Sequence, residues 1–375
     1  MSDNAGAVRA GASTRVFVLS FVAIIVAFLV MLTLDLSLAK IERLETASHA
    51  ASLYADGNTL LGASRVEDAI DRFGLAVTLE RDSAKYVVGL GEAILARGEP
   101  RQAEATLTPR IEADPTDGAL NLAMARVLTK EGRVDDAVSY YHRAIYGRWP
   151  ADRTLNRNQT RSELIDVLAK AQRREELLAE LLQLQDVSSD IAFRKKLARL
   201  FLVAQSPTRA ADMFRAILRS SPADPDAYAG LGEAALARGN FRTAQADLRI
   251  ANQRRPGDLR IDSVLTIADT ALYLDPEDAR AGASENYRRG LRFLHRTVAS
   301  VTACSGARQI PAVRVVADSA NALDRALLPA ATRDAQNDAN LALSARVWKL
   351  RPASCPIVTS GDQALAMVHA AMAQR

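Results

Sequence analysis

The stretch GLGEAILARGEPRQAEATL, residues 89–107, returns with few changes as GLGEAALARGNFRTAQADL, residues 230–248. Both copies place helix-forming residues on either side of an Arg-Gly pair, which predicts two helices joined by a tight turn. A proline follows each copy, at Pro115 and Pro256, where a second helix would end. Recurrence over this length indicates a protein built from helical repeats.

The pattern can be phased at a spacing of 34 residues over residues 50–256, with residues 148–157 as a short insertion around Pro150. Six repeats result: 50–83, 84–117, 118–151, 158–190, 191–224 and 225–256. The sixth is the clearest and carries Tyr228, Leu231, Gly232, Ala244, Leu248, Ala251 and Pro256. This spacing of large residues, Leu-Gly, alanines and proline resembles the tetratricopeptide repeat family.

The resemblance implies an all-α fold in which helical hairpins stack into a right-handed superhelical solenoid and share one core. We expect Gly98, Gly132 and Gly239 to end first helices in the left-handed conformation, which glycine adopts without strain. The fourth repeat departs from the pattern, because Ile165 and Leu177 replace small residues. We therefore expect looser packing or a change of curvature there.

An uncharged apolar run, VFVLSFVAIIVAFLVMLTL, occupies residues 16–34. As a helix at about 1.5 Å per residue it reaches about 28 Å, close to the thickness of a bilayer core. It predicts a cytoplasmic tail at residues 1–15, a transmembrane helix at 16–36 and a helical linker at 37–49. A cleaved signal peptide ending near Ser37-Leu38-Ala39 is the alternative, although the run is long for one.

Arg9 and Arg15 precede the run, whereas charges of both signs follow it. The positive-inside rule then predicts a single-pass protein of the inner (cytoplasmic) membrane, with most of the chain periplasmic or otherwise extracytoplasmic. For residues 257–375 the sequence predicts one irregular repeat, followed by further helices that cap the solenoid. The cysteines, Cys304 and Cys355, would form a disulfide in an oxidising compartment and remain buried thiols otherwise.

No spacing of residues suits catalysis or a cofactor. His49, His142, His295 and His369 are scattered, which predicts surface or interface positions. Nucleotide, hydrolase and zinc motifs are absent from the sequence, and the net charge of +4 is spread without a basic block. We expect no enzyme, no cofactor, no metal site, no small-molecule substrate and no nucleic-acid partner; an enzyme hidden in the last hundred residues is the remaining possibility.

In the tetratricopeptide family the first helices line a groove that binds peptides. Carried over to this chain by position, the resemblance implies a groove lined by Tyr54, Asn58, Lys85, Glu92, Arg126, Lys130, Asp166, Lys170, Lys195, Arg199 and Glu233. Its middle would be basic, with Asp166 as the one acid. We therefore expect an extended acidic segment of a partner protein to bind there, unless these are ordinary solvated charges.

These observations favour a membrane-anchored scaffold or adaptor that mediates protein–protein interactions in a bacterial envelope assembly. The alternative is a cytoplasm-facing adaptor that recruits an enzyme to the membrane, in which case the topology would be reversed and the cysteines reduced.

Overall fold

A computed structural model describes residues 6–188, 190–278, 280–304, 310–323, 332–351, 355 and 357–374. These residues form seventeen α-helices and no β-strand, which confirms the predicted all-α class. The chain divides into two compact bodies, residues 1–167 and 168–375, and each is described by itself. The division falls within α7, in the fourth repeat, where the sequence departs from the repeat pattern.

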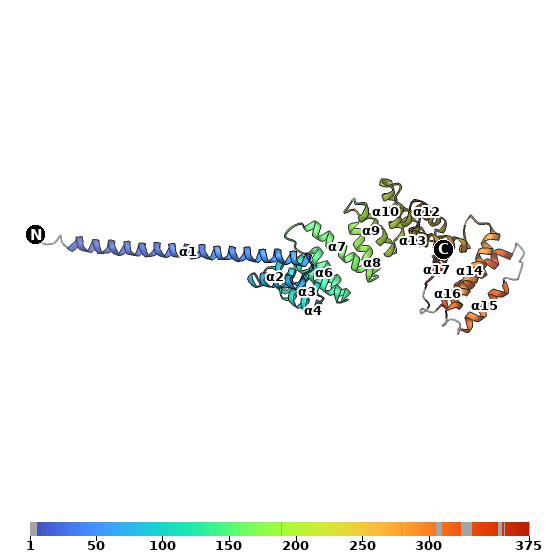
Figure 1. Cartoon of the computed structure of the whole chain (residues 1–375), viewed down its shortest axis with the longest axis horizontal. Helices are drawn as coiled ribbons and strands as arrows, with labels where there is room; N and C mark the ends of the chain where they lie inside the picture. The colour runs from blue at the N-terminus through green and yellow to red at the C-terminus, as the bar shows by residue number, and fades with distance from the viewer. Residues whose placement is uncertain are drawn as a thin grey trace. The chain divides into compact units, whose positions relative to one another are not determined.

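The N-terminal body contains six complete helices and most of a seventh (Figure 1). Their bounds are α1 Gly6–Gly62, α2 Val66–Leu79, α3 Ala84–Arg97, α4 Pro100–Ala113, α5 Gly118–Lys130, α6 Val134–Tyr146 and α7 Arg153–Lys170. The end of α1 pairs with α2, α3 with α4 and α5 with α6, and each pair packs on the next. Three repeats therefore stack side by side in this body.

The C-terminal body begins with the end of α7 and continues with ten more helices. Their bounds are α8 Arg174–Leu184, α9 Ile191–Val203, α10 Pro207–Ser220, α11 Pro225–Ala237, α12 Phe241–Arg254, α13 Leu259–Leu274, α14 Ala283–Ala303, α15 Pro311–Leu323, α16 Arg333–Lys349 and α17 Ser360–Gln374. The pairs α9–α10 and α11–α12 pack on each other, and α13 continues the stack.

A left-handed residue follows the first helix in each of the six predicted repeats, always at the fifteenth position. Gly98, Gly132 and Gly239 have φ values of 95°, 77° and 70°, which confirms the prediction made for them. Ser64, Gln172 and Gln205 occupy the same position in the other repeats, at φ values of 60°, 57° and 54°. A side chain strains this conformation, so these three repeats carry a local cost that the glycine repeats avoid.

Exchanging residues at the fifteenth position tests this cost. Gln205→Gly should raise the free energy of unfolding by about 0.5–1 kcal/mol, and Gly98→Ala should lower it by about 1 kcal/mol. A Cβ at Gly98 meets no atom within 4 Å, so only backbone strain acts there. Urea unfolding followed by circular dichroism measures both values, and a destabilised Gln205→Gly variant would contradict the assignment.

Large side chains at position 24 fill the space between neighbouring repeats. Phe73 and Phe214 are fully buried. A Cβ at Gly57 or Gly89 would lie 2.7 and 2.9 Å from the Phe73 ring, and one at Gly230 would overlap the ring of Phe214. Glycine is thus required where a first helix crosses these rings, because carbon atoms do not approach this closely.

The first helix differs from the predicted division into tail, span and linker. From Gly6 to Gly62 the chain forms one continuous α-helix, so no break separates residues 16–36 from residues 37–49 or from the first repeat (Figure 1). Among the described residues, no helix combines the length and the apolar composition that crossing a membrane requires. Within the predicted span, the side chains of residues 16–20 and 22–24 lie outside the described residues.

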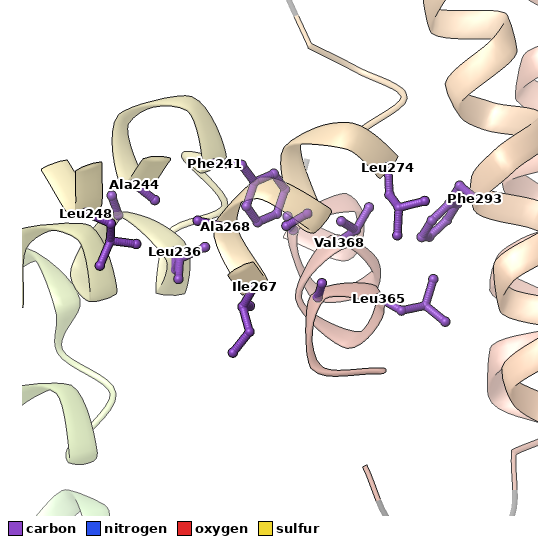
Figure 2. Close-up of a cluster of buried hydrophobic side chains, with 14 of the residues drawn as sticks. Leu236, Phe241, Ala244, Leu248, Ile267, Ala268, Leu274, Phe293, Leu365 and Val368 are labelled. Carbon is purple, nitrogen blue, oxygen red and sulfur yellow. The ribbon is translucent and has the colours of Figure 1, made fainter. Parts of the chain in front are cut away.

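The last helix closes the repeat stack of the C-terminal body. In Figure 2, Leu365 and Val368 of α17 face Ala268 and Leu274 of α13, within a core that also contains Phe241. A second apolar cluster joins α14, α15 and α16. Cys304 and Cys355 form a disulfide with a Cα–Cα distance of 6.0 Å, which links the end of α14 to the segment before α17.

His369 is buried in this cap, so the prediction of a surface or interface position was wrong for it. Its ring stacks on Trp348, with centroids 4.6 Å apart, and lies 4.4 Å from Phe293. Nε2 is 3.0 Å from the Thr297 hydroxyl, which already donates its hydrogen to the Phe293 carbonyl. His369 then donates through Nε2, and because burial lowers its pKa to about 3, the imidazole is neutral at physiological pH.

This buried histidine makes stability depend on pH. Below pH 6.5 the unfolded chain binds a proton at His369 that the folded chain does not, so the free energy of unfolding falls by about 1.4 kcal/mol per pH unit until the folded pKa is reached. Between pH 7 and pH 5 the loss is about 2 kcal/mol. His369→Gln removes this contribution, so comparing urea titrations of both proteins at the two pH values isolates it. An equal loss in both would refute the assignment.

Candidate protein-binding face

The first helices of successive repeats lie next to each other. In the N-terminal body α3 contacts both α1 and α5, and in the C-terminal body α11 contacts both α9 and α13. We call the solvent-facing side of these helices the first-helix face. Residues one repeat apart on this face are neighbours in space, so their side chains can interact across repeats.

An aromatic and cationic cluster occupies the beginning of this face in the N-terminal body. The ring centroid of Tyr54 on α1 lies 5.4 Å from that of Tyr86 on α3 and 5.5 Å from that of Phe73 on α2. Lys85 places Nζ 4.4 Å from the centroid of the Tyr54 ring. Because Lys85 is exposed and Tyr54 half-buried, the cluster offers a cation and part of an aromatic surface to a partner.

A chain of charged side chains continues across the next three first helices. Arg126 on α5 donates two hydrogen bonds to Glu163 on α7, at 2.6 and 2.9 Å, and a third to Glu92 on α3. Glu92 and Arg126 are one repeat apart. The hydrogen bonds to Glu163 are the main cause that raises the pKa of Arg126, against the opposing effect of burial. The trio carries one net negative charge.

In the C-terminal body, four basic side chains converge on Asp226 at the start of α11. Lys195 and Arg199 of α9 reach its carboxylate at 3.3 and 3.0 Å, and Arg255 and Arg260 at 3.1 and 3.4 Å. Partial burial works to raise the pKa of Asp226, but hydrogen bonds from Arg255 and Lys195 outweigh it and lower the pKa to about 2. The carboxylate is therefore ionised at physiological pH.

Further acids balance these cations. Lys195 also pairs with Asp224 at 2.8 Å, and Arg260 pairs with Glu233. Burial raises the pKa of Glu233, although Arg260 and Arg199 oppose the shift. Beside this cluster lies a hollow of about 400 Å³, lined by Ala192, Lys195, Lys196, Arg199, Leu200, Val203 and Asp226. It combines an apolar floor with three cationic side chains.

The remaining predicted groove residues are placed as follows. The structure places Asn58 on α1, Lys130 on α5 and Lys170 at the end of α7, and all three side chains are exposed to solvent. Asp166, also on α7, is half-buried. Lys130 and Arg126 belong to the N-terminal body, whereas Lys170, Lys195 and Arg199 belong to the C-terminal body. The predicted basic patch therefore consists of two parts, one in each body.

The sequence analysis missed four charged residues that complete these clusters: Glu163, Asp224, Arg255 and Arg260. Glu163 was not predicted because α7 begins at Arg153, before the start of the phased repeat, so the family's groove positions do not apply to this helix. Asp224 was detectable as a helix N-cap before Pro225, and its side chain accepts hydrogen bonds from the Asp226 and Ala227 amides. With these residues included, cations no longer outnumber acids around Arg126.

Residues 90–153 and 195–258 match the tetratricopeptide repeat family. These two segments therefore match tetratricopeptide repeats, in agreement with the resemblance seen in the sequence. No curated protein sequence matches it.

Solved structures of helical repeat proteins are similar at low identity. A tetratricopeptide repeat protein from Parabacteroides merdae is 12% identical, over 65% of this chain and 92% of that chain, with a TM-score of 0.40. The C-terminal part of a repeat-containing protein from Cytophaga hutchinsonii is 13% identical, over 63% and 92%, with a TM-score of 0.46. PilF of Pseudomonas aeruginosa is 15% identical, over 67% and 92%, with a TM-score of 0.32.

The ion-paired trio in the N-terminal body can be tested by removing its cation. Arg126→Met leaves Glu92 and Glu163 facing each other without a counter-ion, so the free energy of unfolding should fall by about 1 kcal/mol at pH 7. Adding Glu163→Gln should recover most of the loss, because the repulsion disappears. Urea titrations of the single and double variants measure both effects, and a double variant less stable than Arg126→Met would contradict the arrangement.

Proposed function

We propose that this chain is a membrane-anchored scaffold whose tetratricopeptide repeats bind an extended segment of a partner protein on the first-helix face. The observation that carries the proposal is the row of half-exposed polar and charged side chains on the first helices within each body, set at the spacing of the helical hairpins. Ionic and aromatic groups at such intervals suit a peptide that lies across several repeats. We propose no catalytic activity.

The charges on this face differ between the two bodies and suit partner segments of different charge. Around Arg126 two glutamates leave a net negative charge, which suits a lysine or arginine of the partner. Beside Lys195 and Arg199 the hollow suits a carboxylate, which would share these cations with Asp226. The acidic partner expected from the sequence is thus retained for the C-terminal body alone.

Membrane anchorage is proposed for the first part of α1. Apolar side chains on this helix have no protein covering; Phe21 and Met31 are 65% and 66% exposed. The sequence from residue 16 to residue 34 holds no charge. Leaving such a surface in water costs about 25 cal/mol per Å², whereas a bilayer would remove that cost. The long helix would then carry the repeats away from the membrane.

An extracytoplasmic location is proposed for the repeats and the cap. The charges around residues 16–34 favour a cytoplasmic start of the chain, and the disulfide in the cap suits an oxidising compartment. A role in a bacterial envelope assembly would follow. The cytoplasm-facing adaptor is the second candidate; a topology reporter fused after Arg375 separates the two, since an enzyme active only in the periplasm would be active only in the first.

Photo-crosslinking tests where the partner binds. A photoreactive amino acid at Asn58 or Lys130 places the probe on exposed positions of the first-helix face. Arg72 of α2 and Arg101 of α4 are exposed positions on second helices and serve as matched controls. After irradiation of intact cells, we expect a discrete cross-linked product from the first pair alone. Products from the control positions alone, or from all four equally, would overturn the proposed binding face.

A further inference from the structure

The segment of α1 between the apolar run and the first repeat has an uncovered apolar side. Residues 40–45 are exposed all around the helix, including Ile41 at 51% and Leu44 at 61%. Figure 1 shows α1 extending well beyond the hairpins of its own body. A lone helix in water gains little stability without an apolar contact, so this segment requires a covering partner.

Ile41 and Leu44 of this segment fit a seven-residue period that takes in apolar residues of the preceding run, whereas Leu36 and Leu38 lie off it. With Ile41 at position a and Leu44 at position d, Leu34 falls at the preceding a position, and Ala27 and Val30 continue the same seam toward the membrane. An a/d seam is the pattern that packs two helices as a coiled coil. Ser37 and Ser48 also fall on it and weaken it, so the seam is short outside the membrane.

The flanking charges define which partner fits. Lys40 occupies position g and Glu45 the following position e, the two positions that pair between helices in a parallel coiled coil. Among the described residues, neither takes part in an ion pair within the chain. The charges are thus complementary to a second, parallel copy of the same helix.

We propose that two copies of this chain pair in parallel through α1, along the seam of Ala27, Val30, Leu34, Ile41 and Leu44. The proposal rests on the proposed membrane anchorage in one respect, because two helices that enter the bilayer from the same side are held parallel. Confinement to a membrane also raises the effective concentration of the copies, which compensates for the short seam. The first-helix faces of two chains would then be presented together.

Single cysteines test the seam, because the native cysteines are already joined to each other. Ile41→Cys and Leu44→Cys lie on the seam, and Glu42→Cys and Arg43→Cys are matched controls on the outer side of the same turn. In oxidised membranes from cells that express the full chain, we expect several-fold more disulfide-linked dimer from the seam positions. Equal cross-linking at all four positions, or none at the seam, would overturn the pairing.

A charge exchange tests orientation. In the Leu44→Cys background, Lys40→Glu should reduce the linked dimer several-fold, and adding Glu45→Lys should restore it. Loss without restoration would contradict the parallel arrangement.

Alkaline carbonate extraction of the same membranes reports the anchor separately. A chain that is released but still cross-links at Leu44→Cys refutes anchorage and retains the pairing. A chain that stays in the pellet without cross-linking refutes the pairing and retains anchorage, and one that is released without cross-linking refutes both.

Discussion

The structure depends on the contact between a large side chain near the end of one repeat and a glycine in the first helix of the next. The ring of Phe214 lies against Gly230, and the ring of Phe73 lies between Gly57 and Gly89. A glycine lets the helix axis approach the ring, and the ring fills the space that a glycine leaves. The contact occurs at two junctions, between the first and second repeats and between the fifth and sixth, and it places the two hairpins of each junction in the same way.

This placement determines what the protein offers to a partner. Stacked hairpins bring successive first helices side by side. Arg126 therefore meets Glu92 at the same position of the preceding repeat, and Lys195 on α9 meets Asp226 on α11. The ion pairs are half-exposed, so they contribute little to stability. Their consequence is a surface with a defined order of charges, fixed by the buried contacts beneath it, as the proposed scaffold requires.

Much of the fold could be predicted from the sequence because the same pattern occurs several times: the paired helices and the left-handed glycines between them follow from the recurring spacing. The cap helices lack this repetition, and His369 was misplaced because its burial depends on Trp348 and Phe293, which are distant in sequence. The charge of the face could be predicted only in part. Arg126 could be predicted because it occupies a groove position of the family. Glu163 could not, because its helix is lengthened by an insertion, and neither could Arg255 and Arg260, because they flank a turn.

The most direct measurement of the stacking contact is a double-mutant cycle between Phe214 and Gly230. Gly230→Ala should lower the free energy of unfolding by about 1–3 kcal/mol in the native chain, because the added methyl overlaps the ring. In a Phe214→Val background the same change should cost nothing or stabilise by up to about 1 kcal/mol, since alanine is the better helix former. Equal costs in both backgrounds would contradict the account.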